Sequence, residues 1–205
     1  MNIERLLAIS SEPKAGPPRT WPSTVPPELV TLLGERNGFY AFASALHVRA
    51  LDDVPGRGDG LVTWNAPTRW IDRYEDPALA ERWFFGEDVF GDQFCLHQGR
   101  VERMEAETGQ FSEVASSLDA WAELVLDELE AETGYEAARD WQAQHGPLAE
   151  GFRLVPRKPF VIGGTSDVAN LVAKDEVAGM RMRGRFAAQL RKLPDGKKVR
   201  IRPAR

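Results

Sequence analysis

The chain has 205 residues, of which 42% are hydrophobic, and a formal net charge of −5, a composition typical of a globular protein with a sizeable core. No apolar run approaches the roughly 18 residues that a membrane span needs, and the opening "MNIERLLAIS" lacks the apolar core of a signal peptide. A single cysteine, Cys95, excludes an internal disulfide framework. We therefore expect a cytoplasmic protein with no membrane contact.

Charge is distributed unevenly along the chain. Residues 75–150 contain 19 acidic and 4 basic residues, a net charge of −15, whereas residues 179–205 contain 10 basic and 1 acidic residue, a net charge of +9. Such segregation indicates one of three arrangements: the two regions face each other, one of them recruits a partner of opposite charge, or both are solvated.

The first elements follow from prolines and apolar spacing. Residues 13–27 hold six of the fourteen prolines and predict an irregular connector. The next segment, "PPELVTLLGERNG", predicts a helix that begins at its prolines and ends at Asn37-Gly38. "GFYAFASALHVRAL" then leads into a strand, and residues 52–60 form a loop. Residues 61–74 are partly helical, with Trp64 and Trp70 as large core candidates.

The central region changes from a two-residue to a helical period. Phe94 and Leu96 alternate with Cys95 and His97, and "QG" and "ETGQ" predict turns between successive strands that end near Val114. Two capped helices follow. The pattern S-x-x-D predicts that Ser116 starts the first helix, and residues 133–136 form a capping box for the second, which ends at Gly146-Pro147.

The last third contains an extended segment, "LVPRKPFVIGG", and a helix, "GMRMRGRFAAQLRKL". The helix places Met182, Phe186, Leu190 and Leu193 on one apolar side. A terminal strand is expected in "KKVRIRP". Because strands precede the main helices, we predict an α+β fold with an antiparallel sheet flanked by helices. The expected organisation is a helix and connector over residues 1–25, a domain over 26–150, and a basic extension over 151–205 packed on or beside it.

The stretch "FFGEDVFGDQF" raises the question of a catalytic or metal site because it holds Glu87, Asp88 and Asp92 close together. No basic side chain lies among these carboxylates to tune a pKa, and their spacing does not fit a calcium loop. We therefore interpret them as a turn with exposed carboxylates, and predict a non-catalytic protein with neither a metal nor a cofactor. Cys95 and His97 share a strand face, but one pair of ligands does not make a zinc site.

The chain resembles the SUKH superfamily, which includes fungal cell-wall-assembly regulators and bacterial immunity proteins. The resemblance lies in "PPELVTLLGERNGF", in "FFGEDVFGDQFCL" with the following "VERMEAETGQFSEVASSLDAWAELVL", and in "ETGYEAARDWQAQHGPL". It covers about residues 26–150, and extends less closely to "KPFVIGGTSDVANL" and "LPDGKKVRIR".

The resemblance implies a protein-binding domain that neutralises a toxin delivered by other bacteria. A basic toxin domain would be attracted by the acidic region. The predicted partner-binding residues are Glu87, Asp88, Asp92, Glu102 and Glu105. Two alternatives stay open. One is an intracellular regulatory or scaffold protein, and the other, less favoured, is nucleic-acid binding through residues 181–205. The sequence does not determine the oligomeric state.

Overall fold

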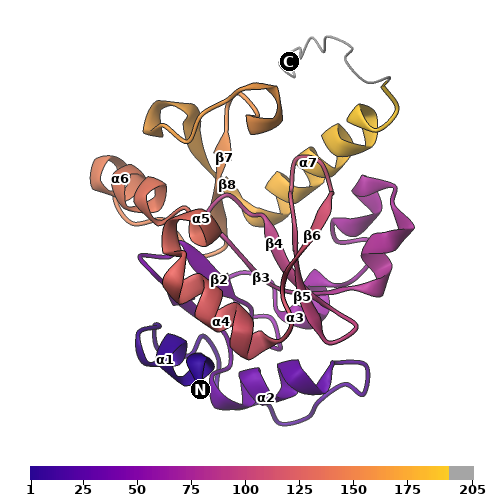
Figure 1. Cartoon of the computed structure of the whole chain (residues 1–205), viewed down its shortest axis with the longest axis vertical. Helices are drawn as coiled ribbons and strands as arrows, with labels where there is room; N and C mark the ends of the chain where they lie inside the picture. The colour runs from indigo at the N-terminus through magenta and orange to yellow at the C-terminus, as the bar shows by residue number, and fades with distance from the viewer. Residues whose placement is uncertain (194–205) are drawn as a thin grey trace.

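A computed structural model of the chain describes residues 1–193 and contains one large antiparallel sheet and one small one (Figure 1). The large sheet follows chain order: β1 (Phe39–Ala41), β2 (Leu46–Val48), β3 (Trp83–Glu87), β4 (Gln93–His97), β5 (Arg100–Met104) and β6 (Phe111–Ala115). The small sheet pairs β7 (Phe152–Pro156) with β8 (Leu171–Asp175). The predicted α+β class with an antiparallel sheet is confirmed.

Helices cover the large sheet. The α-helices are α1 (Asn2–Ala8), α2 (Pro27–Glu35), α3 (Leu61–Trp64), α4 (Leu118–Asp127), α5 (Leu129–Thr133), α6 (Tyr135–His145) and α7 (Glu176–Leu190). Four 3-10 turns are η1 (Ile71–Tyr74), η2 (Pro77–Glu81), η3 (Phe160–Ile162) and η4 (Val168–Asn170). No helix within residues 1–193 is long and apolar enough to cross a membrane.

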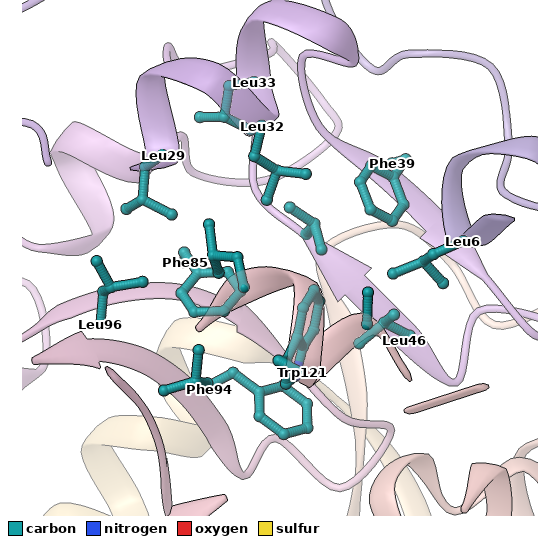
Figure 2. Close-up of a cluster of buried hydrophobic side chains, with 14 of the residues drawn as sticks. Leu6, Leu29, Leu32, Leu33, Phe39, Leu46, Phe85, Phe94, Leu96 and Trp121 are labelled. Carbon is teal, nitrogen blue, oxygen red and sulfur yellow. The ribbon is translucent and has the colours of Figure 1, made fainter. Parts of the chain in front are cut away.

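One face of the sheet packs against α1, α2 and α4 (Figure 2). Phe85 and Phe94 of the sheet contact the Trp121 ring of α4 edge-on, at centroid distances of 5.1 and 5.5 Å. Leu6 of α1 and Leu29 of α2 belong to the same buried cluster. This core therefore unites the N-terminal helix with the central region of the chain.

The opposite face of the sheet is also covered. Trp64 and Trp70 pack with Phe84, as expected for large core residues, and Met180 of α7 belongs to the same cluster. Cys95 lies on this face and is fully buried, because α7 closes over a surface that the meander alone would expose.

The hairpin between β4 and β5 shows how sequence sets the register. Gln98 and Gly99 both have positive φ, 51° and 78°, which is the backbone of a two-residue type I′ turn. That turn pairs His97 with Arg100 and places Cys95 opposite Glu102. The "QG" turn is thus the one that the sequence predicts.

Both predicted helix caps differ from the structure. Ser117, not Ser116, caps α4 by accepting a hydrogen bond from the Ala120 N–H. Thr133 ends α5 instead of starting α6, because its hydroxyl donates to the Leu129 carbonyl. Gly134 separates the two helices with a φ of +66°, and a Cβ there would lie 2.4 Å from the Phe90 ring.

The helix α7 begins earlier than predicted and buries a different side. Asp175 caps it by accepting from the Ala178 N–H, and Val177, Met180 and Ala187 face the core. Met182 is exposed, so the predicted apolar stripe is wrong. The small residues of the helix, including Gly184 against the Tyr74 ring, allow close packing on η1 and carry no hydrophobic signal in the sequence.

The strand β8 lies in a segment for which the sequence predicts no element. The expected terminal strand at residues 197–203 lies outside the described residues.

Candidate functional site

The first two predicted partner-binding residues are not on the surface. Glu87, at the end of β3, and Asp88, in the following turn, have no exposed surface. The interpretation of these residues as exposed turn carboxylates is therefore wrong. Their burial is possible because arginines from distant parts of the chain neutralise them, a pairing that local sequence does not reveal.

Glu87 is the centre of a buried group of charges that we call the ionic cluster. Its members are Lys14, His47, Arg49, Glu87, Arg153 and Glu176, each 4% exposed or less. One Glu87 carboxylate oxygen lies 2.9 Å from an Arg49 nitrogen and 2.8 Å from Arg153 Nε. The other oxygen accepts a hydrogen bond from the Gln93 amide at 2.9 Å. Burial works to raise the pKa of Glu87, but Arg49 and Arg153 hold it well below its ordinary value.

The sheet and α7 position the second carboxylate of the cluster. Arg49 follows β2, and its guanidinium donates to both oxygens of Glu176, at 3.1 and 3.2 Å. The same guanidinium stacks over the Trp64 ring, 3.3 Å from the centroid. Because Glu176 is the first residue of α7, this bidentate pair fixes the start of the helix against the sheet.

A lysine from the N-terminal connector completes the ionic cluster. The Lys14 ammonium nitrogen lies 2.8 Å from His47 Nε2, 3.3 Å from the Tyr40 hydroxyl and 2.8 Å from the Arg57 carbonyl. His47 Nδ1 lies 3.0 Å from Glu87. Burial and Lys14 hold the pKa of His47 well below its ordinary value, so we assign a neutral ring that donates from Nδ1 to Glu87 and accepts at Nε2.

The cluster brings His47, Glu87 and Glu176 within 4.8 Å of one another, a spacing that could hold a metal ion. The carboxylate oxygens are, however, already bound to Arg49 and Arg153, which stand where a metal would need open coordination positions. A divalent cation beside these two guanidinium groups and Lys14 would add positive charge to a group with two carboxylates. The residues therefore fit an internal cross-link and not a metal centre.

Asp88 and Asp92 belong to a second charged group. Arg103 of β5 lies 2.7 Å from Asp88 and 3.1 Å from Asp92. Asp88 accepts from the Asp92 N–H, and Asp92 accepts from the Ala106 N–H, both at 2.9 Å. Burial works to lower the pKa of Arg103, but Asp88 and Asp92 raise it above its ordinary value. These carboxylates hold the turn closed.

The other two predicted residues differ from each other. Glu102 is half-buried and pairs with Arg82 at 2.6 Å and with His97 at 3.0 Å. The pKa of Glu102 is lowered by Arg82 and His97 against the effect of burial. Glu105 is exposed, and among the described residues its carboxylate accepts a hydrogen bond only from the Thr108 hydroxyl. Of the five predicted residues, Glu105 alone keeps a freely exposed carboxylate.

A concentrated exposed charge lies on the helices that follow the large sheet. Residues 118–145, which form α4 to α6, contain eight acidic residues and one basic residue, Arg139. The exposed carboxylates form what we call the acidic helical face: Glu123, Asp127, Glu128, Glu130, Glu136 and Asp140. Within residues 1–193, Asp140 is the one member with an ion pair, to its neighbour Arg139. The excess of acidic residues in this part of the sequence indicates an acidic surface. The positions of those residues on the helices show where that surface lies.

The basic residues of α7 and the following turn are largely engaged within the chain. Arg183 is buried and donates to the Phe90 carbonyl, and Arg181 donates to the Arg69 carbonyl at 2.6 Å. Arg191 lies 3.5 Å from Asp76, and Lys192 lies 2.7 Å from Glu75. Within residues 179–193, part of the basic charge is therefore bound by carboxylates and carbonyls elsewhere in the chain.

Comparisons with known proteins show the fold and nothing finer. No family model and no curated protein matches the chain. Among solved structures, Atu4351 from Agrobacterium tumefaciens is similar over 89% of this chain and 88% of that chain, with a TM-score of 0.55 and 12% sequence identity. At this identity the similarity shows that the two chains share an architecture that includes both the sheet and its covering helices.

Proposed function

We propose that this chain is a non-catalytic, SUKH-like protein-binding domain that captures a basic partner, and that the partner is a bacterial toxin which it neutralises. The observation that carries the proposal is the acidic helical face. It presents six exposed carboxylates on α4 to α6 and the junction between α4 and α5, five of them without an ion pair inside the described chain. The resemblance of residues 26–150 to the SUKH superfamily supplies the kind of partner.

A non-catalytic role is supported by the closure of the ionic cluster. General acid–base chemistry needs a titratable group within hydrogen-bond reach of a substrate. His47, Glu87 and Glu176 have the required chemistry, but they are buried and bonded to one another and to arginines. Each therefore serves to hold the sheet, β7 and α7 together.

Electrostatics explains how the acidic helical face would act. Toxins that cleave nucleic acids carry basic surfaces, since they must hold phosphate. A concentrated acidic surface steers such a partner and raises its association rate, most strongly at low ionic strength. Rim charges of this kind alter association rate more than they alter folding.

Where the gene beside this one encodes a toxin-domain protein, the experiment uses that protein as the binding partner. The variant Glu123→Lys/Asp127→Lys is compared with Glu12→Lys/Asp52→Lys, which makes the same change in net charge at exposed residues elsewhere. We expect the first variant to lower the association rate by about ten-fold at low salt and the second to leave it nearly unchanged. Equal rates for both variants and the parent protein would overturn the role of this face.

Gene context separates immunity from the regulatory alternative. If no toxin gene lies beside this one and the neighbouring products do not bind, the immunity role is wrong and a regulatory or scaffold role replaces it. Nucleic-acid binding receives less support from the described residues, since Arg181, Arg183, Arg191 and Lys192 have partners within the chain.

A further inference from the structure

An open hollow of about 340 Å³ lies where α1, α2 and α4 meet. Its apolar lining comes from Ile3 and Leu7 of α1, Leu32 of α2 and Leu118 of α4. These three helices lie together at the end of the molecule opposite the β7–β8 hairpin (Figure 1). The volume is at the lower end of the range of about 300–1,000 Å³ for ligand pockets, which suits one or two side chains.

Carboxylates surround this apolar hollow. Its lining includes Glu4, Glu28, Glu35 and Asp119. Asp119 is partly used, because it accepts a hydrogen bond from the Ile3 N–H at 3.1 Å. Glu28 and Glu35 are exposed, and neither forms an ion pair with any residue in the 1–193 range. Glu4 pairs with the N-terminal ammonium at 3.1 Å, so the hollow offers an apolar floor beside the free negative charge of Glu28 and Glu35.

The hollow is continuous with the acidic helical face through α4. The first turn of α4 contributes Leu118 and Asp119 to the hollow, and later turns present Glu123 and Asp127 to solvent. A partner attracted to the acidic helical face would meet this hollow at the N-terminal end of the same helix. Protein interfaces commonly take most of their binding energy from one or two apolar anchors in a pocket with a polar rim.

We propose that the hollow between α1, α2 and α4 is the anchor site for a basic partner protein, and that it accepts a large apolar side chain flanked by lysine or arginine. This inference rests on the proposed function, because it names a specificity element for the same partner. The apolar side chain is buried on Ile3, Leu7, Leu32 and Leu118, while the flanking cations meet Glu28 and Glu35. Charge alone would attract any cation, whereas the hollow selects a cationic segment with an apolar residue.

The test uses two synthetic helical peptides of lysine and alanine. One carries two leucines spaced four residues apart, and the other carries serines at the same positions. Binding to the full chain is measured by fluorescence anisotropy at low salt, and chemical-shift changes identify the contacted residues. We expect the leucine peptide to bind at least about ten-fold more tightly, because burial of a leucine side chain in the hollow removes its apolar surface from water.

Two variants of the chain examine the hollow directly. Thr31 is an exposed residue of its lining, so Thr31→Trp fills the space and should remove the preference for leucine. Gln189→Trp is the matched control at an exposed position of α7 and should leave the preference intact. Glu28→Lys/Glu35→Lys gives an independent readout, because it should weaken both peptides while the hollow remains open.

The outcomes separate this inference from the proposed function. If both peptides bind equally, respond to Glu123→Lys/Asp127→Lys and ignore Thr31→Trp, the anchor site is wrong and the acidic helical face stands. Binding of neither peptide counts against both proposals. If sedimentation finds a dimer that Thr31→Trp dissociates, the hollow is an interface between two copies and the anchor proposal is overturned.

Discussion

The ionic cluster and the acidic helical face use the same kind of side chain for opposite purposes. In the cluster, Glu87 and Glu176 have almost no exposed surface and are bonded to arginines from β7 and from the end of β2. On the face, Glu123 and Asp127 are exposed on α4 and have no ion pair within residues 1–193. A buried carboxylate without its partner is costly, whereas an exposed one costs almost nothing.

This contrast indicates which carboxylates of an acidic chain are able to bind a partner. Charge density along the sequence treats Glu87 and Glu123 alike. Burial separates them, because a carboxylate whose lone pairs are filled internally has nothing left for a partner. Substitutions in the two regions measure this separation.

Replacement of Glu87 by Gln should have the largest effect on folding. The change removes the charge shared by Arg49 and Arg153 and leaves two buried guanidinium groups insufficiently compensated. The free energy of unfolding should fall by about 3–5 kcal/mol, as measured by urea denaturation. Glu123→Gln is the exposed control and should change stability by less than about 0.5 kcal/mol. Similar losses in the two variants would remove the distinction between cluster and face.

The two arginines of β5 provide a matched pair for the second charged group. Arg103 is 19% exposed and binds Asp88 and Asp92, whereas Arg100 is 57% exposed and pairs with Glu113. Arg103→Met should cost about 1–3 kcal/mol because Asp88 loses its cation in a buried position. Arg100→Met should cost about 0–1 kcal/mol, the usual worth of a surface pair. Thermal and urea denaturation of both variants would check this, and an equal cost would contradict it.

Lys14 should give the folded protein a distinctive pH dependence. Burial lowers the pKa of Lys14 from 10.5 to about 7, with a further contribution from the nearby Arg49. Between these two pH values the unfolded chain keeps a proton on Lys14 that the folded chain has released. Stability should therefore rise with pH across this window, by up to about 1.4 kcal/mol per unit, and be unaffected by this group below pH 7.

The measurement compares the parent protein with Lys14→Met, which removes the titrating group and leaves the other charges in place. Subtraction of the two curves removes contributions from Tyr40 and other groups that titrate in the same range. We expect the parent to gain stability relative to the variant from pH 7 to pH 10. Parallel curves would contradict the assigned lowering of the Lys14 pKa.

Local signals predicted the meander and its turns, since alternation and the "QG" turn act between neighbouring residues. They also predicted Trp64 and Trp70 as core residues. The ionic cluster escaped prediction because its members come from five separate segments, and Arg153 reaches Glu87 across 66 positions. No periodicity connects such residues. The buried side of α7 could not be predicted for a related reason. It is formed partly by small residues such as Gly184, which packs against Tyr74 and adds nothing to a hydrophobic pattern.

The acidic helical face should show the smallest effect on folding, and that is the strongest test of its role. Glu123→Lys/Asp127→Lys changes two exposed carboxylates to cations, and Asp127 is the last residue of α4, where a positive charge interacts favourably with the helix dipole. Relief of repulsion between neighbouring acids acts in the same direction. The free energy of unfolding should therefore stay within about 0.5 kcal/mol of the parent or rise slightly, while Glu12→Lys/Asp52→Lys behaves the same way.

A loss above about 2 kcal/mol in the first variant alone would mean that these carboxylates are structural, like Glu87, and the partner surface would have to lie elsewhere. Retained stability, joined to a slower capture of a basic partner, would identify charges kept for binding.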